Sequence, residues 1–364
     1  MSAQSWAPSR RFREWMTFGV ADRAPLWEWS PWESTLRRWQ REDLGESAKP
    51  PQFGECDEKV RCGVDQWMLP RFEERILAED DETVTDLTDR GVVRRRFKSR
   101  DVTAMPEYID YPVKRRADWE SLKGRYDPSD PARFPPDWRK RCREWRNRQP
   151  VVVFQTARAP SLFGLVRELM GPERTLYAFY DEPALVHDIM EFNTEFLIGL
   201  LPRVLDECPV TTIFFWEDMS YRGGPLISPA MFKEFMVPRY KRVTEMARGK
   251  GIDTIMVDSD GNVEQLIPLW LESGINGVYP MEVAAGMDVA KLRSQYGRDL
   301  VMTGGIDKRT LAKDRKAIDE ELARRLPVAE RGGYIPHLDH AIPHDVPYEN
   351  FAYYWERKKA MLGI

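Results

Sequence analysis

Acidic residues and histidines follow most of the apolar strands that the second half of the chain predicts. Glu217 and Asp218 end the stretch TTIFFWED, and Asp258 and Asp260 end TIMVDSD. The residues that follow the other predicted strands include Glu28, Glu282, Asp307, His337, Asp339 and His340. A single acid after a strand is commonly the cap of the next helix. Two such side chains in one loop, repeated over several loops, indicate general acid–base chemistry or a divalent-metal site.

His340 is the leading candidate within this set. Three of the four histidines fall in the segment PHLDHAIPH, which begins at Pro336. Asp258, Asp260 and His340 together offer oxygen and nitrogen ligands that suit Zn²⁺, Mn²⁺ or Fe²⁺, with zinc preferred. Two plainer alternatives stay open. The imidazoles either bond to the backbone or face solvent, and Asp260 caps the next helix while Asp258 alone faces the site.

The elements that must position these residues are regular only from residue 150 onward. Strands are predicted to begin at Pro150, Thr211, Thr254, Gly277, Leu300 and Gly332. Between and after them, helical periodicity covers residues 160–170, 181–205, a stretch opening at Ser228, 263–271, 288–296, a stretch ending at Leu326, and 348–362. About seven or eight such units favour an α/β fold, the (β/α)8 TIM barrel. Active-site groups of that fold lie at the carboxyl ends of its strands.

Residues 1–149 are predicted to form an irregular N-terminal extension, within a single domain that spans residues 1–364. A strand is expected over 24–29. A hairpin is expected over 83–97, where TVTDLT and VVRRRF flank the turn DRG. The charged stretch 118–148 is expected to hold loops and short helices, and its aromatic residues need a core against which to pack.

Composition excludes several classes of protein. Lys and Arg number 55 and Asp and Glu 59, so the net charge of −4 argues against a nucleic-acid-binding surface, which needs a basic excess. Four cysteines are too few for a disulfide scaffold, and no two of them form a C-x-x-C pair. The N-terminal segment is polar, and no apolar run approaches the ~18 residues of a membrane span. We therefore expect a cytoplasmic protein with no membrane or nucleic-acid partner.

Three segments resemble the uroporphyrinogen decarboxylase superfamily. They are FFWEDMSYRGGPLISPAMFKEFMVPRYKRV, TGGIDKRTL and PHLDHAIPHDVPYENF, which lie between Phe214 and Phe351. The resemblance implies a (β/α)8 barrel and one of two chemistries. In the decarboxylase branch, Asp65 in DQWMLP matches the family's characteristic aspartate, and His340 and Asp218 match its closing-loop histidine and its serine. The arginine loop that serves a polycarboxylate substrate is missing here.

In the methyltransferase branch, the resemblance places Asp258-Ser259-Asp260 at the family's zinc-binding H-x-C, and His340 at its last zinc-binding cysteine. The spacing is kept while thiolates are replaced by harder ligands. The leading hypothesis is therefore an O-demethylation type of methyl transfer between a small methoxylated compound and a corrinoid that a separate protein carries. Asp258, Asp260 and His340 would bind a divalent metal or act as acid and base.

The remaining candidates are assigned to the substrate. Glu217, Asp218 and Glu282 would position it, Trp27, Trp29 and Trp216 would supply apolar walls, and Tyr221, Asp307, His337 and Asp339 would complete the pocket. One alternative is a decarboxylase of uroporphyrinogen or a smaller carboxylate, which uses Asp65 and needs no cofactor. Another is a non-catalytic corrinoid-binding partner. Relatives also make a homodimer plausible.

Overall fold

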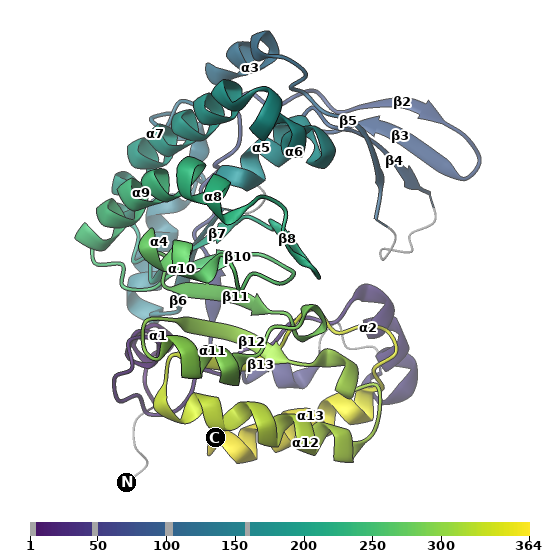
Figure 1. Cartoon of the computed structure of the whole chain (residues 1–364). Coiled ribbons are helices and arrows are strands. Elements are labelled where there is room, and N and C mark those ends of the chain that lie inside the picture. Colours follow the sequence, from purple (N-terminus) through teal and green to yellow (C-terminus); the bar gives the residue numbers. More distant parts are fainter. Residues whose placement is uncertain (1–4, 46–49, 99–104, 157–160) are drawn as a thin grey trace.

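The chain folds around a curled parallel sheet (Figure 1). The computed structural model describes residues 5–45, 50–98, 105–156 and 161–364. Seven strands are hydrogen-bonded in the order β1-β6-β7-β10-β11-β12-β13, every pair of them parallel. Helices that follow the strands cover the outside of the sheet, as the alternating sequence pattern predicts. The α/β barrel prediction is confirmed.

The strands of this sheet are β1 (Lys59–Arg61), β6 (Val151–Thr156), β7 (Thr212–Trp216), β10 (Ile255–Asp258), β11 (Gly277–Met281), β12 (Val301–Ile306) and β13 (Tyr334–Leu338). The helices of the regular half are α5 (Leu162–Met170), α6 (Pro172–Asp181), α7 (Pro183–Glu207), α8 (Pro229–Phe235), α9 (Val237–Gly249), α10 (Ile267–Glu272), α11 (Val289–Tyr296), α12 (Arg315–Arg325) and α13 (Tyr348–Leu362). A short hairpin, β8 (Ser220–Tyr221) and β9 (Gly224–Pro225), follows β7.

Two predicted helices have different ends in the structure. The helix that opens at Ser228, whose hydroxyl accepts a hydrogen bond from the Met231 N–H, divides into α8 and α9 at Met236. Pro238 explains the break, because its ring would clash with the carbonyl of Glu234, four residues earlier, and because it has no N–H to donate to that carbonyl. Asp181, predicted as the cap of the long helix, instead ends α6, and Glu182 precedes α7.

The predicted strand 24–29 is not a regular strand. The extended segment 24–30 nevertheless fills the space between the last and first strands of the sheet. The Asp57 N–H, just before β1, donates to the Leu26 carbonyl (2.9 Å), and beyond β13 the Ile342 N–H donates to the Ser30 carbonyl (3.4 Å). Pro25 and Pro31 lack the N–H groups that a continuous ladder needs, which accounts for the irregularity.

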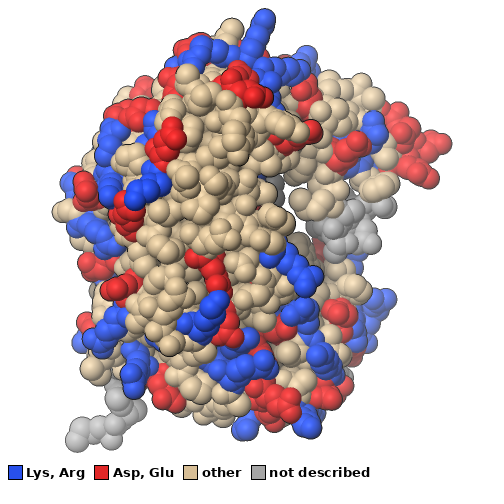
Figure 2. All heavy atoms as spheres, viewed as in Figure 1, with Lys and Arg blue, Asp and Glu red and all other residues tan. Residues whose placement is uncertain are grey.

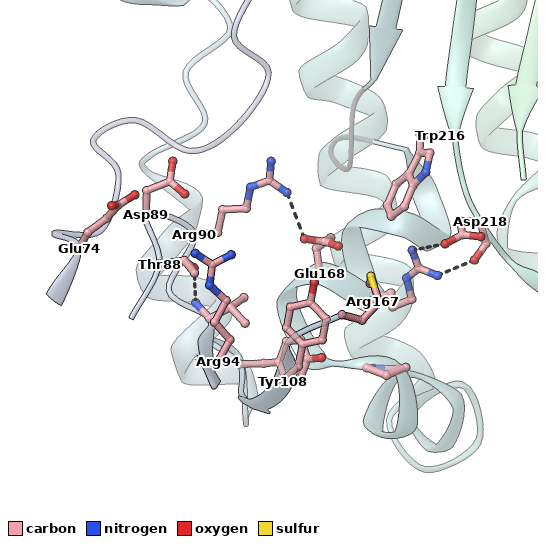
Figure 3. Close-up of a pocket in the computed structure, with 14 residues that line it drawn as sticks. Glu74, Thr88, Asp89, Arg90, Arg94, Tyr108, Arg167, Glu168, Trp216 and Asp218 are labelled. Carbon is pink, nitrogen blue, oxygen red and sulfur yellow. Dashed lines mark hydrogen bonds and ion pairs between the residues drawn. The ribbon is translucent and has the colours of Figure 1, made fainter. Parts of the chain in front are cut away.

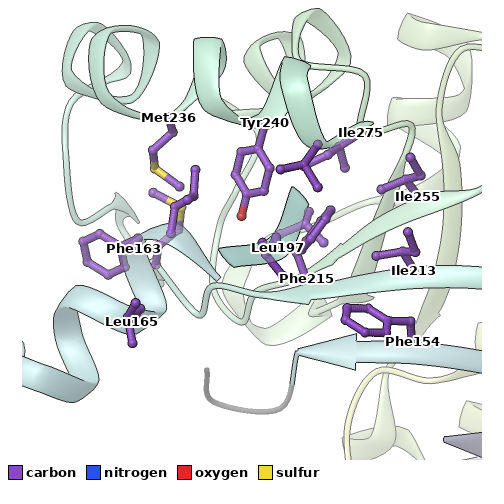
Figure 4. Close-up of a cluster of buried hydrophobic side chains, with 14 of the residues drawn as sticks. Phe154, Phe163, Leu165, Leu197, Ile213, Phe215, Met236, Tyr240, Ile255 and Ile275 are labelled. Atoms are coloured by element: carbon purple, nitrogen blue, oxygen red, sulfur yellow. The ribbon is translucent and has the colours of Figure 1, made fainter. Parts of the chain in front are cut away.

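The core has two layers, on either side of the sheet. Inside the curl, Phe12, Trp27, Phe214, Met256 and Tyr279 are among the side chains that fill the barrel. Outside it, apolar residues of the sheet pack against the surrounding helices, and Figure 4 shows part of this layer around Phe215, Leu197 and Tyr240. Trp27 therefore belongs to the barrel filling, where it stacks on Phe12 with ring centroids 5.4 Å apart.

The N-terminal half adds a projecting antiparallel sheet. The predicted hairpin is confirmed as β3 (Thr83–Leu87) and β4 (Val93–Phe97), and it is extended on either side by β2 (Arg75–Glu79) and β5 (Glu107–Asp110). Figure 1 shows this four-stranded arm projecting from the body beside α6. The sequence analysis did not predict the two outer strands.

The other N-terminal elements are helical. They are α1 (Pro8–Met16), α2 (Glu33–Trp39), α3 (Arg116–Lys123) and α4 (Trp138–Arg148). The last two confirm the prediction for 118–148, and Trp119, Tyr126, Phe134, Trp138 and Trp145 are buried as expected. Among the described residues, no helix is long and apolar enough to cross a membrane. Acidic and basic side chains are interspersed over the face shown in Figure 2.

Candidate active site

The barrel mouth, defined here as the carboxyl ends of the parallel strands with the loops that follow them, gathers the predicted acids. Asp258 ends β10 and Asp260 lies two residues later, while Asp218 follows β7 and Glu282 follows β11. The loops are tied together by the backbone, because the N–H groups of Glu217 and Asp218 both donate to the Asp258 carbonyl, at 2.8 and 3.2 Å. The negative charge of Asp218 helps to raise the pKa values of both Asp258 and Asp260, and that of Glu282 helps to raise the pKa of Asp260.

The pKa values of two of these acids are raised. Burial, followed by the charges of Asp260 and Asp218, raises the pKa of Asp258 well above its ordinary value. Asp260 keeps about 46% of its side chain exposed, yet loss of solvent around it and the charges of Asp218 and Glu282 raise its pKa to about 7. Asp260 is thus poised to exchange a proton near neutral pH.

His340 faces Asp260. Its Nε2 lies 3.9 Å from Asp260 Oδ2, and its ring stacks on Trp29 and Trp32, with centroids 5.1 and 6.1 Å apart. Burial and the charge of Lys308 lower the pKa of His340, so the imidazole is neutral at the pH where Asp260 titrates. A protonated carboxyl beside a neutral imidazole is an arrangement through which a proton can pass. The predicted association of these two residues is observed.

Asp218 is held by Arg167 of α5. One Arg167 nitrogen is 3.1 Å from Asp218 Oδ2, a second donates to the Asp218 carbonyl, and the guanidinium lies over the Trp216 ring at 4.6 Å. Asp218 also has a φ of +44°, in the left-handed region that few residues other than glycine adopt. Figure 3 shows Arg167, Asp218 and Trp216 along one side of a cavity of about 440 Å³, with Tyr108 of the arm among its other lining residues.

Glu217 has a structural role that the sequence analysis did not predict. Its side chain is fully buried and accepts hydrogen bonds from the Leu162 and Gly164 N–H groups, at 2.9 and 2.8 Å, and from the Tyr240 hydroxyl. It therefore caps the first turn of α5. Burial raises its pKa to about 7. These contacts give Glu217 a capping role, and its predicted catalytic and substrate-positioning roles stay predictions.

Three more residues that were predicted to contact the substrate form hydrogen bonds with protein groups. His337 is buried, its Nδ1 bonds to the Leu338 carbonyl at 2.7 Å, and burial lowers its pKa to about 4. Asp339 is fully buried and accepts from the N–H groups of Val283 and Lys308, which joins the loops after β11 and β12.

Asp307 caps the short helix Lys308–Thr310 and pairs with Arg309. Asp307, His337 and Asp339 are therefore each held by protein groups, and their predicted contact with a substrate stays a prediction. Trp27 is buried in the barrel filling, and its predicted role as an apolar wall of the substrate pocket likewise stays a prediction.

The other predicted residues lie at or near the mouth. Trp29 stacks on Tyr279 as well as on His340. Glu282 remains beside Asp260 and accepts from the Gly261 N–H at 2.8 Å. Tyr221 is 58% exposed on β8. Asp65, after β1, accepts from the Trp67 N–H and from Arg71, at 2.9 and 2.6 Å.

Comparison with known protein families identifies the family of this chain. Residues 101–361 match the family model described as "Uroporphyrinogen decarboxylase (URO-D)", which is well over half of the chain. The chain belongs to the URO-D family. This finding confirms the resemblance inferred from the sequence.

Curated relatives of this URO-D family member are distant. Uroporphyrinogen decarboxylase from Synechocystis sp. is 23% identical over 184 residues, which are 50% of this chain and 49% of the relative. The chloroplastic enzyme of Zea mays is 22% identical over 187 residues, 50% of this chain and 44% of the relative. The chain spans about half the length of the curated relatives it matches.

The fold is also shared with a methyltransferase from Methanosarcina mazei, which is 13% identical with a TM-score of 0.61 over 98% of this chain and 99% of that one. At that identity the likeness shows the fold alone.

The predicted metal site is not assembled in this URO-D family chain. Among the described residues, no group of three or more His, Cys, Asp or Glu side chains is arranged to hold a metal ion. Asp260 and His340 approach each other, but Asp258 does not complete a ligand set with them and instead meets the Gln155 amide at 3.4 Å. The residues therefore do not fit the predicted zinc site, and we derive no chemistry through a metal.

Several residues of the mouth were missed by the sequence analysis. Arg167, Lys308 and Gln155 all contact predicted acids, and Arg61 of β1 lies near Asp258, whose pKa it lowers. Gln155 could have been found by the rule used for the acids, because it is near the end of the apolar run VVVFQT. Arg61 gave no such signal, since β1 is only three residues long and lies in a polar stretch.

Proposed function

We propose that this chain is a methyltransferase of the URO-D family, which takes a methyl group from a small methoxylated compound and passes it to a corrinoid carried by a separate protein. The observation that supports this proposal most directly is the pair of Asp260 and His340 at the barrel mouth. It combines a carboxyl group that titrates near pH 7 with a neutral imidazole, and both are open to a ligand.

Cleavage of a methyl ether leaves an alkoxide or phenolate, which must be protonated. The Asp260 carboxyl supplies that proton to the ether oxygen as the C–O bond breaks, and general-acid help of this kind contributes about 10²- to 10⁴-fold in rate. His340 then relays a proton from solvent back to Asp260. Burial also raises the pKa of Asp258 well above its ordinary value, and the protonated form of its carboxyl does not repel the departing oxygen. The corrinoid, when bound, supplies the nucleophile that accepts the methyl group.

The rim of the mouth fits a large, flat, mostly apolar partner group. Trp32 is 40% exposed beside His340, and Tyr221 on β8 is 58% exposed. The Tyr221 carbonyl accepts a hydrogen bond from the Asn262 N–H, in the loop that carries Asp260. Exposed aromatic faces next to a reacting group favour stacking with a planar ring. We expect the corrinoid to meet these residues. The Methanosarcina mazei neighbour is named a methyltransferase, and that activity enters here as part of the proposal.

The assay uses the purified chain without oxygen, with methoxylated benzoates as methyl donors and a free reduced corrinoid as acceptor. Demethylated product is measured by chromatography and mass spectrometry. Asp260→Asn is expected to lower kcat about 10²- to 10⁴-fold, because an amide cannot protonate the leaving oxygen. Asp253→Asn, the same change at an exposed residue before β10, is the control and should keep full activity. No methyl transfer by the unaltered chain with any donor would contradict the proposal.

A decarboxylase is the second candidate, because Asp65 lies in a cavity with three arginines. Arg61, Arg71 and Arg90 line the same space of about 320 Å³. Cations of this kind stabilise carboxylate substrates, and the curated relatives are uroporphyrinogen decarboxylases. Incubation with uroporphyrinogen decides between the two: formation of coproporphyrinogen, abolished in Asp65→Asn, would support decarboxylation and displace the methyltransferase proposal.

A further inference from the structure

A second cavity opens beside the acids of the barrel mouth. It lies where β1 and β6 end, has a volume of about 320 Å³, and is lined by Arg61, Asp65, Gln66, Trp67, Arg90 and Gln155, among others. Gln155 joins it to the reaction centre, because the Gln155 amide nitrogen is 3.4 Å from Asp258 Oδ2. A ligand in this cavity therefore extends directly toward Asp258.

The cavity carries an unbalanced positive charge. Arg71 is neutralised by Asp65 and Asp89, at 2.6 and 2.8 Å, and Arg90 by Glu168 at 3.2 Å. Arg61 differs from both, since its side chain has no hydrogen bond or ion pair to any described residue, although its backbone pairs with β6. Its guanidinium offers five N–H donors in a planar fork that matches a carboxylate.

Polar atoms of two neighbouring side chains also lack partners. The Trp67 indole N–H is buried and has no acceptor in the part of the chain that the structure describes. Gln66 is 6% exposed and donates from Nε2 to the Gln155 carbonyl at 2.9 Å, while its Oε1 has no donor within the same described ranges. Buried polar groups are normally hydrogen-bonded, so their occurrence beside a cavity suggests that a ligand completes them.

We propose that this cavity is a carboxylate subsite, in which Arg61 and the Trp67 indole N–H bind an anionic group of the methyl donor. The inference rests on the proposed function and names its substrate class, a methoxylated carboxylate. The Arg61 fork takes the two carboxylate oxygens, and the methoxy end of the same molecule reaches Asp258 and Asp260. Gln66 Oε1 accepts from a hydroxyl or a water molecule bound with the ligand.

The subsite is tested by binding, which does not depend on catalysis. Calorimetry compares 4-methoxybenzoate with 4-methoxybenzamide, which has nearly the same shape but no charge. The benzoate should bind about 10- to 100-fold more tightly, the range for charge-assisted hydrogen bonds, and Arg61→Gln should abolish the difference. Arg61→Lys should restore part of it. Arg95→Gln, the same change at an exposed arginine of the arm, is the control and should have no effect.

The outcomes separate this inference from the function on which it rests. Equal affinities for benzoate and benzamide, or an Arg61→Gln variant that keeps the preference, would overturn the subsite even if methyl transfer is observed. Loss of the preference in Arg61→Gln with no methyl transfer would retain the subsite and reject the proposed function. Inorganic phosphate is added as a competitor, and stronger binding of phosphate than of benzoate would assign the cavity to a phosphoryl group and overturn the carboxylate assignment. Thermal melting checks that the variants are folded, as expected for a change at exposed Arg61.

Discussion

Replacement of Lys358 by methionine tests how the irregular segment 24–30 is held in the barrel. Lys358 and Glu28 are fully buried, with Lys358 Nζ 2.7 Å from Glu28 Oε2 and 3.2 Å from the Trp27 carbonyl. Glu28 also accepts from the Tyr354 hydroxyl at 2.7 Å and from the Leu338 N–H at 2.9 Å. This network joins the segment to α13 and to β13.

The expected cost follows from burial. Methionine fills most of the lysine volume, so the change chiefly removes the positive charge and leaves the Glu28 carboxylate buried beside neutral donors. Breaking one side of a buried pair costs about 3–5 kcal/mol in the free energy of unfolding. Replacing both partners, in Glu28→Gln with Lys358→Met, removes the stranded charge and should recover most of that loss.

Unfolding in guanidinium chloride, followed by tryptophan fluorescence, measures these differences in free energy. Lys359→Met is the matched control. The neighbouring lysine pairs at the surface with Glu55, at 2.6 Å, so its replacement should cost only about 0–1 kcal/mol. If Lys358→Met is no more destabilising than this control, or if the double variant is no more stable than Lys358→Met, the buried pair does not hold the segment and the reasoning is refuted.

Two further predictions concern the acids of the site. Asp260 must be protonated to act as an acid, and its pKa is raised to about 7, so kcat should fall as the pH rises through about 7. This decline should vanish in Asp260→Asn. A pH profile of kcat that stays flat across that range in the unaltered chain would exclude Asp260 as the acid. Glu217→Gln should lower the free energy of unfolding by about 1–3 kcal/mol, since its amide nitrogen cannot accept from the N–H groups that the carboxylate caps, while kcat of the folded variant stays near normal. Chemical denaturation and steady-state kinetics on the same sample check both parts, and a large loss of kcat without a loss of stability would favour a catalytic role for Glu217.

The gathering of acids and His340 at one edge of the sheet could be predicted from the sequence, while the orientation of their side chains could not. Parallel strands bring their carboxyl ends to one edge, so Asp258, Asp260 and His340 had to lie near each other once the strands were recognised. Glu217 and Asp218 follow the same strand, but one caps α5 and the other faces the mouth. The chain leaves the strand at this point, where Asp218 has a positive φ, and only the packing of α5 places free N–H groups against Glu217.

The arginines near these acids are a second feature that could not be predicted from the sequence. Arg61 is in a three-residue strand whose partner, β6, lies about 90 residues away, so neither its direction nor its closeness to Asp258 is visible locally. Arg167 was within a predicted helix, and only the contact of α5 with the end of β7 places it against Asp218. The arm strands β2 and β5 were missed for a similar reason, since each is short and is stabilised mainly by pairing with the hairpin.

The sequence by itself determined the α/β barrel, the family and the edge of the sheet at which the acids gather, because these depend on hydrophobic periodicity and on motifs that are local in the chain. The tertiary structure decided which polar groups are hydrogen-bonded inside the protein and which remain at the barrel mouth. His337, Asp339 and Glu217 find buried backbone donors or acceptors, whereas Asp260 and His340 remain at the mouth. A carboxylate's chemistry depends on the solvent and charges around it, and those are fixed only when distant strands and helices pack.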